Sequence, residues 1–355
     1  MTIHNFSAGP SALPRPVREK LAETFALDPD LTPSVVEISH RGQEFIAIAE
    51  RLQAGLRRLM GVGEEHEVLL LQGGAHLQFA MLPMNFARGR TAAFSITGHW
   101  GEKAFAESAR IVETRLVGSS AEDGYRDLPE LGHLPADAAY LHYTGNETIH
   151  GVQYADPPAA AVPLAVDLSS EFLSRPYPYA DLGMMYAGAQ KNLGVAGLTV
   201  VLVRRDLLER IPDDLPTYLD YRTWANSDSM KNTPCTFAWY VALEVIDWIE
   251  SLGGLEAVGK RNRDKADRLY AAIDASDFYA NPVHPDARSM MNVPFVMADE
   301  GLTMRFVEQA EAEGMPGLKG HRAVGGLRAS LYNAVEPDAV TALVEFMHEF
   351  ERRHG

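Results

Sequence analysis

The chain has 355 residues, of which 46% are hydrophobic and 23% are charged, so it can bury a large core and is not expected to be disordered. Its 32 Lys and Arg against 48 Asp and Glu residues give a net charge of −16, which disfavours nucleic acid and anionic membranes as main partners. A single cysteine, Cys235, excludes an intramolecular disulfide and a cysteine-cluster metal site. The start of the chain lacks a secretory pattern and no apolar run reaches about 18 residues, so we expect a cytoplasmic protein without a membrane span.

Apolar residues recur with helical spacing in six segments, and each of these predicts a helix. The predicted helices are 16–25, 43–60, 236–252, 255–273, 302–313 and 337–353. Between about 65 and 205 the pattern changes to short apolar runs bounded by Gly, Asp or Pro. These predicted strands are 68–71, 91–96, 111–116, 138–142, 164–167, 184–188 and 198–203. Their spacing leaves room for crossover helices, which indicates a mostly parallel α/β sheet.

The chain also divides by composition. After Gly253-Gly254 the pattern becomes helix, strand, helix, which suits a smaller C-terminal α+β domain. The first residues are rich in Pro and Gly and predict an extended arm that packs on another part of the molecule. We therefore expect an arm over 1–15, a large domain over 16–254 and a small domain over 255–355.

Lys191 is the first candidate for chemistry, because it follows the apolar and small residues MMYAGAQ. A lysine just past a buried strand is desolvated, which lowers its pKa and makes available a neutral amine that can form a Schiff base with an aldehyde. From position alone, a lysine that reaches the surface is the more frequent alternative.

Asp167 ends the apolar run PLAVD, 24 residues before Lys191. A carboxylate at the carboxyl end of a parallel strand points into the crevice where such sheets bind ligands, although a helix N-cap is the alternative. The spacing allows both residues to reach the same edge of the sheet from two strand ends. A carboxylate for a pyridinium N–H and a lysine for an aldehyde are the two groups that pyridoxal phosphate requires.

A phosphate would need a separate site, and the segment QGGAH at 72–76 joins the apolar VLLL to a helical pattern. Backbone N–H groups at such a helix start favour phosphate, whereas a Gly-Gly pair is more often only a tight turn. Trp100 could cover a planar ring by stacking, whereas a tryptophan is more often simply part of a core.

Longer stretches of the chain match one known family. They include NFSAGP, EISHRGQEF, HYTGNETIHG, DLSSEFLSRP, YAGAQKNLGVAGLT, NTPCTFAWY, RSMMNVPF and GLKGHRAVGGLRASLYNA. With these motifs the chain resembles, over nearly its whole length, the phosphoserine aminotransferase family, pyridoxal-phosphate enzymes of fold-type I within the class V aminotransferases. The pairing of AGAQKN with GHRAVGGLRASLYNA is highly specific. The resemblance implies a large domain with a mostly parallel seven-stranded sheet flanked by helices, plus a smaller C-terminal α+β domain.

The resemblance also assigns roles toward pyridoxal 5'-phosphate. Lys191 looks like the lysine that bonds the cofactor and carries the proton between Cα and C4′, and Asp167 looks like the partner of the pyridinium nitrogen. Trp100 looks like the stacking residue and Thr148 like a further contact.

The phosphate cradle looks like Ala75, His76 and Gln190, completed from the other subunit by Asn232 and Thr233. A homodimer with active sites at the subunit interface is therefore implied. The family often has arginine where His76 stands and serine where Ala8 stands.

The implied substrates, glutamate, 2-oxoglutarate, phosphoserine and 3-phosphohydroxypyruvate, are all anions, so the chain needs local cations despite its net charge. By resemblance, Arg328 looks like the α-carboxylate anchor, and the pocket for the distal phosphate or γ-carboxylate looks like His40, Arg41, His321 and Arg322. Each charge-assisted hydrogen bond contributes about 1.5–3 kcal/mol, so three or four of them can hold a phosphate. The alternative is that these residues form surface pairs of little energetic value.

The resemblance thus implies ping-pong transamination between glutamate and 3-phosphohydroxypyruvate, in serine biosynthesis. In bacteria the family also aminates a phosphorylated hydroxy-keto acid, giving 4-phosphohydroxy-L-threonine on the route to pyridoxine. Three alternatives stay open. A cysteine desulfurase would need a mobile nucleophilic cysteine, and Cys235 is more consistent with a small packed residue. A serine/alanine–glyoxylate-type aminotransferase would keep Lys191 and Asp167 without needing the second cationic cluster, and a non-catalytic phosphometabolite-binding protein would keep only the scaffold.

Overall fold

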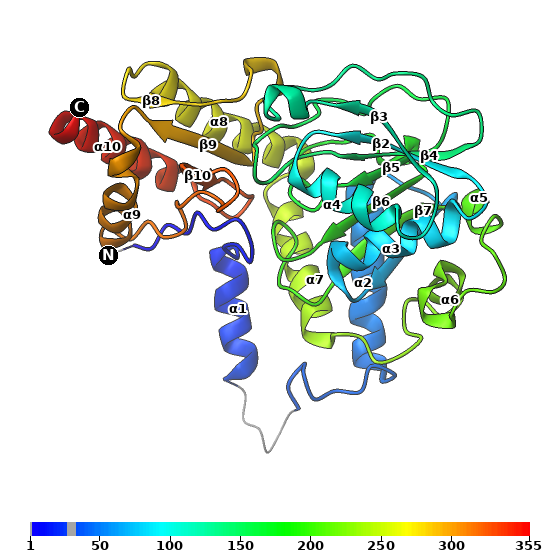
Figure 1. Ribbon diagram of the computed structural model, residues 1–355. Coiled ribbons are helices and arrows are strands. Elements are labelled where there is room, and N and C mark those ends of the chain that lie inside the picture. The colour runs from blue at the N-terminus through cyan, green and yellow to red at the C-terminus, as the bar shows by residue number, and fades with distance from the viewer. Residues whose placement is uncertain (1, 27–32) are drawn as a thin grey trace.

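The computed structural model describes residues 2–26 and 33–355 and contains two sheets, each with helices packed on it (Figure 1). The α-helices are α1 (Arg15–Phe25), α2 (Gln43–Met60), α3 (Gly74–Phe86), α4 (His99–Ser108), α5 (Arg205–Leu208), α6 (Tyr221–Ala225), α7 (Thr236–Ser251), α8 (Gly254–Asp274), α9 (Thr303–Ala312) and α10 (Pro337–His354). Short 3-10 helices cover Ala121–Asp123, Tyr179–Asp181, Thr217–Leu219, Pro285–Ala287 and Glu300–Leu302.

The larger sheet has seven strands in the order β1-β7-β6-β5-β4-β2-β3. They are β1 (His66–Leu71), β2 (Thr91–Ile96), β3 (Thr114–Ser119), β4 (Ala138–Thr144), β5 (Leu164–Asp167), β6 (Met184–Gly188) and β7 (Thr199–Arg204). Only β7 runs against its neighbours, since its pairs with β1 and β6 are antiparallel and the other pairs are parallel. The predicted mostly parallel seven-stranded sheet is therefore confirmed.

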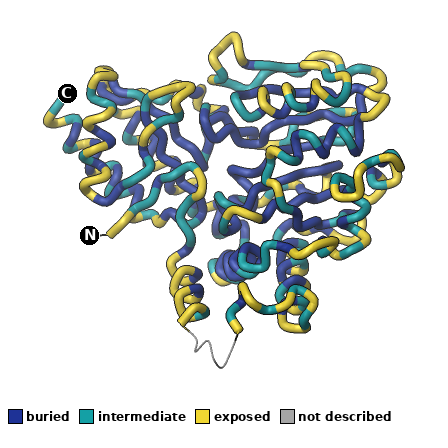
Figure 2. The backbone as a smooth tube through the Cα atoms, turned by 60° about the horizontal axis from the view of Figure 1, so that its bottom comes forward, coloured by how far each residue is buried: buried dark blue, intermediate teal, exposed yellow. Residues whose placement is uncertain are grey.

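Both faces of this sheet are covered, which explains why its central strands are mostly apolar. On β6, Met185 and Ala187 face the cluster that contains α1, α2 and α7, whereas Met184 and Tyr186 face the cluster that contains α3, α4 and α6. This alternation follows from the two-residue period of a strand. Figure 2 shows the strands buried along most of their length, with exposed residues in loops and on outer helix faces.

The smaller sheet has the order β10-β9-β8, with β8 (Tyr279–Ala280), β9 (Asn292–Met297) and β10 (Leu327–Ser330). It packs with α8, α9 and α10 around a separate apolar core. Phe6, from the first segment of the chain, is fully buried in that core. The backbone of this segment also bonds to the C-terminal part, since the N–H of His4 donates to Gly314 O and the N–H of Phe6 donates to Pro316 O.

The predicted helices are all present, with ends that differ by at most one residue. One predicted strand is displaced: the expected run 111–116 corresponds to β3 at 114–119, because Ile111 and Val112 close the end of α4 through their N–H bonds to Ser108 O. Helix α1 begins at Arg15, one residue before the predicted start of this helix. Met1 and residues 27–32, which fall within the predicted arm and large domain, lie outside the described residues. In the described part of the chain, no helix is long and apolar enough to cross a membrane.

Candidate active site

A cavity of about 340 Å³ lies at the carboxyl edge of the larger sheet. It is lined by Ala8, Gly9, Gly74, Ala75, His76, Trp100, Thr144, Asn146, Thr148, Ile149, Asp167, Ser169, Ser170, Gln190, Lys191, His321 and Arg328. Most of these residues end a strand or follow one, and the carboxyl ends of parallel strands meet at one edge of a sheet. Segments from both ends of the chain, at Gly9 and Arg328, complete the wall.

Lys191 follows β6 and reaches into this cavity. Its Nζ atom donates a hydrogen bond to Oγ1 of Thr148 at 2.8 Å. Burial lowers the pKa of Lys191 to about 8, the negative charge of Asp167 opposes this change, and the positive charge of Arg328 adds to it. The amine therefore has a much larger neutral fraction near neutral pH than an ordinary lysine, which makes it suited to act as a nucleophile or a base.

Asp167 is the last residue of β5, the neighbour of β6 in the sheet, and it is buried beside Lys191 in the same cavity. Its Oδ1 atom accepts the N–H of Ser169 at 2.8 Å. Burial raises the pKa of Asp167, whereas the hydrogen bond from Ser169 and the charge of Lys191 lower it. A buried carboxylate without an arginine partner in this pocket can hold a cationic N–H group of a ligand.

The first turn of α3 supplies backbone donors to the cavity. Gly73 precedes the helix with a φ of 93°, and a Cβ atom there would lie 2.5 Å from Leu77, so the turn requires glycine. Gly74, Ala75 and His76 then line the cavity with first-turn N–H groups, which have no partner inside a helix. Such a turn binds phosphate through its N–H groups and the helix dipole.

Trp100 lies in the first turn of α4, and its ring meets that of His76 edge-on, with centroids 5.5 Å apart and an angle of 88°. The Nε1 atom of Trp100 is buried without a hydrogen-bond partner in the described residues. The indole thus forms an aromatic wall of the cavity.

Arg328 brings a buried cation to the cavity from β10 of the smaller sheet. Its Nη1 atom donates to the carbonyl oxygen of Thr148 at 3.3 Å, and its Nε atom has no partner among the residues that the structure describes. Burial lowers the pKa of this guanidinium, which nevertheless keeps its charge because its ordinary value is so high. His321 lines the same cavity, so a carboxylate bound there would meet two donors.

The structure thus brings nine of the predicted site residues to one cavity: Ala75, His76, Trp100, Thr148, Asp167, Gln190, Lys191, His321 and Arg328. Five others do not line it. His40 and Arg41 lie in the loop before α2, Arg322 is exposed beside His321, and Asn232 and Thr233 are exposed before α7. Thr233 lies near the turn that precedes α3, because its carbonyl oxygen accepts a hydrogen bond from Gln72 Nε2 at 3.2 Å.

Sequence reasoning missed other wall residues, including Asn146 and Ser170, whose side chains bond to each other at 2.7 Å. It also missed Glu147, which is buried behind the wall. Both Asn146 and Glu147 stand in the motif HYTGNETIHG, from which only Thr148 was assigned a role. The signal that could have identified them is the presence of polar residues directly after an apolar strand.

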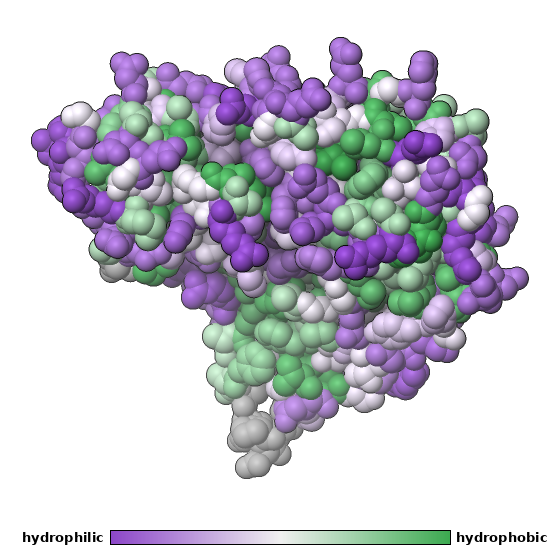
Figure 3. Space-filling view, in the orientation of Figure 1, coloured by the Kyte–Doolittle hydropathy of each residue, from purple (hydrophilic) through white to green (hydrophobic). Residues whose placement is uncertain are grey.

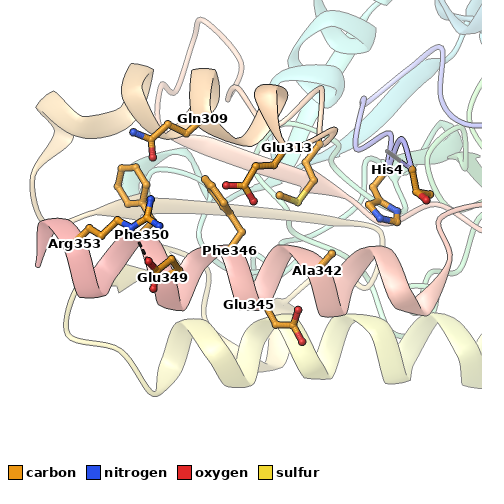
Figure 4. A pocket seen from close by; sticks show the side chains of 11 residues that line it. His4, Gln309, Glu313, Ala342, Glu345, Phe346, Glu349, Phe350 and Arg353 are labelled. Atoms are coloured by element: carbon orange, nitrogen blue, oxygen red, sulfur yellow. Dashed lines mark hydrogen bonds and ion pairs between the residues drawn. The ribbon is translucent and has the colours of Figure 1, made fainter.

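A second cavity, of about 380 Å³, lies far from this chemistry, between the first residues and helices α9 and α10 (Figure 4). Its polar wall consists largely of glutamates, and Arg353 is already paired with Glu349 at 2.6 Å. It contains neither a buried lysine nor any residue predicted for the site.

Comparison with known proteins agrees with this geometry. The model of the family described as aminotransferase class-V matches residues 3–343, so the chain belongs to the class V aminotransferases.

Within that family it is similar to phosphoserine aminotransferases. The enzyme of Laribacter hongkongensis is 48% identical, with 100% of each chain covered. The solved structure of phosphoserine aminotransferase from Bacillus circulans subsp. alkalophilus is 47% identical and has a TM-score of 0.96, covering 100% of this chain and 99% of that one. The phosphoserine aminotransferase of Trichomonas vaginalis, solved with pyridoxal phosphate bound, is 38% identical with a TM-score of 0.93 and covers 98% and 100%.

Proposed function

We propose that the protein is a phosphoserine aminotransferase, which transfers the amino group of glutamate to 3-phosphohydroxypyruvate and so forms O-phospho-L-serine and 2-oxoglutarate. The observation that carries this proposal is the buried Lys191 amine, which shares one cavity with Asp167 and Arg328. The full-length similarity to phosphoserine aminotransferases supports the choice of substrates and disfavours both the glyoxylate-type enzyme and a non-catalytic binding protein.

The donor set of the cavity fits pyridoxal 5'-phosphate as the cofactor. Lys191 would bond its aldehyde, Asp167 would hold its ring nitrogen, and the first turn of α3 would hold its phosphate. Trp100 supplies an apolar face for the ring. When bound, the cofactor supplies an aldehyde that joins to an amine and a conjugated ring that withdraws electrons from the adjoining carbon.

The residues of the chain then have distinct tasks. Lys191 in its neutral form takes the proton from Cα of the amino-acid substrate, since its lowered pKa leaves a free electron pair near neutral pH. Thr148 orients the amine through the 2.8 Å hydrogen bond. Arg328 binds the α-carboxylate of the substrate with the N–H group that has no partner in the described residues. His321 donates to the same anionic end of the substrate.

A second copy of the chain would complete the site. This part of the proposal is supported by Arg41, Asn232 and Thr233, which are exposed and lie outside the cavity of their own chain, as does the half-buried His40. Figure 3 shows apolar side chains over the lower part of the molecule around α1, where Phe25 is 53% exposed. Such surface favours association of subunits, so we propose a homodimer whose active sites lie at the interface.

The division into an arm (1–15), a large domain (16–254) and a small domain (255–355) belongs to the same proposal, supported by the separate apolar cores. Arg328 from the small domain and Lys191 from the large one meet in one cavity, so the active site needs both. The cytoplasmic location stays a prediction from the sequence.

The decisive experiment uses purified protein supplied with pyridoxal phosphate. The holoprotein is expected to absorb visible light, and borohydride is expected to fix the cofactor on Lys191, as mass spectrometry of the peptide would show. Glutamate and phosphoserine should each change the absorbance, whereas alanine with glyoxylate should not be turned over. A colourless protein, or turnover of glyoxylate in preference to the phosphorylated keto acid, would refute the proposal.

The dimer has its own test. A Lys191→Ala chain and an Asn232→Ala/Thr233→Ala chain should each be nearly inactive. When the two are mixed and allowed to exchange subunits, a mixed dimer has one intact site, so activity should return. If activity stays absent although mixed dimers form, the cross-subunit role of Asn232 and Thr233 is wrong.

A further inference from the structure

The loop that follows β4 connects three parts of the active site through three consecutive residues, Asn146, Glu147 and Thr148. The side chain of Asn146 donates to Ser170 Oγ, behind Asp167, and to Asn292 Oδ1 in the smaller sheet, at 2.7 and 2.8 Å. Thr148 contacts Lys191 and Arg328, as described above. The loop is therefore fixed to the two sheets on both sides of Glu147.

Glu147 itself is fully buried and bonds to neither sheet. Its two carboxylate oxygens accept the backbone N–H groups of Trp100, at 3.2 Å, and of Gly101, at 2.9 Å. These N–H groups belong to the first turn of α4, where no intrahelical acceptor exists. The residue at the N-cap is Gly98, which has no side chain to accept them. A carboxylate from 46 residues or more along the chain thus takes the place of a local cap.

The packing around this carboxylate requires Gly98. A Cβ atom at Gly98 would lie 2.7 Å from Cδ of Glu147 and 2.6 Å from Nδ1 of His150. These separations are shorter than van der Waals contact, so even alanine would push the Glu147 carboxylate away from the helix. The segment at Gly98 and the side chain of Glu147 can therefore approach each other this closely only because position 98 is a glycine.

The charges and hydrogen bonds around Glu147 agree with its position as the cap of α4. Burial raises the pKa of Glu147 to about 7, whereas the N–H groups of Gly101 and Trp100 lower it. The nearby charges of Asp167 and Lys191 act in opposite directions on it. The two backbone donors and the positive end of α4 thus offset part of the cost of placing a second carboxyl group near Asp167.

We propose that Glu147 is a positioning residue for Trp100: it holds the first turn of α4 against the loop Asn146–Thr148 and so sets where the indole lies relative to Lys191. The two hydrogen bonds do not depend on the proposed function. Only the consequence for a cofactor ring, that its stacking surface is held in place, rests on that function.

The direct test is hydrogen exchange of the full-length protein, with and without pyridoxal phosphate, followed by mass spectrometry of overlapping peptides that cover 98–104. Glu147→Gln keeps the shape of the side chain but turns its NH₂ group toward one of the backbone donors. We expect exchange at the amides of Trp100 and Gly101 to rise at least about tenfold, because one charge-assisted bond is lost and the other is weakened. Glu102→Gln is the matched control, since Glu102 is an exposed carboxylate on the same helix; exchange at 98–104 should stay unchanged.

Cofactor binding provides a second readout. Glu147→Gln is expected to weaken binding of pyridoxal phosphate at least about tenfold and to reduce the circular dichroism of the bound cofactor in the visible range, because the ring loses a fixed stacking partner. A merely structural role would instead raise exchange throughout the large sheet and leave that dichroism unchanged per bound cofactor. If exchange at 98–104 in Glu147→Gln equals that of the unsubstituted protein, the inference is overturned.

If Glu147→Gln fails to fold, Gly98→Ala carries the same test, since it displaces the carboxylate without removing it. Faster exchange confined to 98–104 supports the inference, and unchanged exchange overturns it. Failure of the proposed function is separate: the unsubstituted protein would then bind no cofactor, or would not react with glutamate and phosphoserine, while the exchange results would still decide the role of Glu147.

Discussion

Lys191 and Arg328 both bind Thr148: the amine of Lys191 donates to its hydroxyl, and the guanidinium of Arg328 donates to its carbonyl. Both side chains are thus held beside Thr148, near enough for their charges to interact. Because like charges disfavour one another, Arg328 adds to the lowering of the Lys191 pKa that burial causes.

The first prediction concerns this amine. In protein freed of cofactor, Lys191 should be mostly ammonium below pH 8 and mostly neutral above it, with a midpoint near the pKa of about 8. Arg328→Gln should raise the midpoint, and Asp167→Asn should lower it further, since the carboxylate favours the ammonium form. The rate of acylation at Lys191 against pH, followed by mass spectrometry, measures the midpoint. Lys260 is the internal control, because its bond to Asp264 raises its pKa. If the two lysines titrate together, the account of Lys191 is wrong.

The second prediction separates the two arginines near His321. Arg328→Ala should slow the half-reactions with both glutamate and phosphoserine by about a hundredfold or more, because the α-carboxylate that both substrates share loses a charge-assisted hydrogen bond and its buried cation. Arg322→Ala should mainly impair the reaction with phosphoserine, since a doubly charged phosphate depends more on a further cation than a carboxylate does. Single-turnover absorbance changes with each amino acid give the two rates. Equal losses in both variants would contradict this division of roles, and Arg322→Lys should recover part of the phosphoserine rate.

The third prediction concerns the stability of the smaller sheet. Lys265 in α8 is fully buried and donates to three backbone carbonyls, those of Leu331, Tyr332 and Val335. Lys265→Met fills the space but leaves these acceptors without donors, so the free energy of unfolding should fall by about 2–5 kcal/mol. Lys260→Met, on the exposed face of the same helix, should change it by no more than about 0.5 kcal/mol. Urea unfolding of both variants is the measurement, and similar midpoints for the two would rule out the role of Lys265.

The fourth prediction concerns the first segment of the chain. Phe6 is fully buried in the core of the smaller sheet, whereas Ile3 is 61% exposed. Phe6→Ala should release the segment and increase its rate of cleavage by a protease, because the loss of a buried aromatic side chain costs about 3–5 kcal/mol. Ile3→Ala should leave that rate nearly unchanged. Cleavage is followed as loss of the N-terminal peptide in mass spectra, and equal rates in the two variants would show that Phe6 does not anchor the segment.

Much of the fold could be predicted from local patterns, since strands buried on both faces and helices with one apolar face have distinct periods. Helix α4 is an exception. Gly101 interrupts its pattern, and the group that caps it is Glu147, a residue of another segment. No local signal can report a cap that arrives only in the folded state. Strand β3 was misplaced for a related reason: it is an edge strand whose Arg115 and Leu116 are exposed, so it lacks the apolar run of a central strand.

The residues of the candidate site likewise divide into those that local sequence patterns predict and those that they do not. Lys191 and Asp167 could be predicted because each follows a buried strand, and parallel strands bring such ends together. Which cavity His40 or Asn232 serves could not be predicted from their residue types, because that depends on how two chains associate. The resemblance to a family suggested the answer for Asn232 and Thr233 alone, and their position outside the cavity of their own chain is compatible with it.

Gly9 lines the cavity, and the docking of its segment has a consequence for folding during synthesis. The segment around it bonds to Gln190 through the N–H of Ser11, and to Gly314, Pro316 and Ser330 through the backbone of His4 and Phe6. A ribosome synthesises this segment well before Gly314, Pro316 and Ser330, so Phe6 has no binding site until β10 has emerged. A nascent chain should therefore carry Phe6 unshielded until β10 is synthesised, and the cavity should gain both its Gly9 and its Arg328 walls only at that stage.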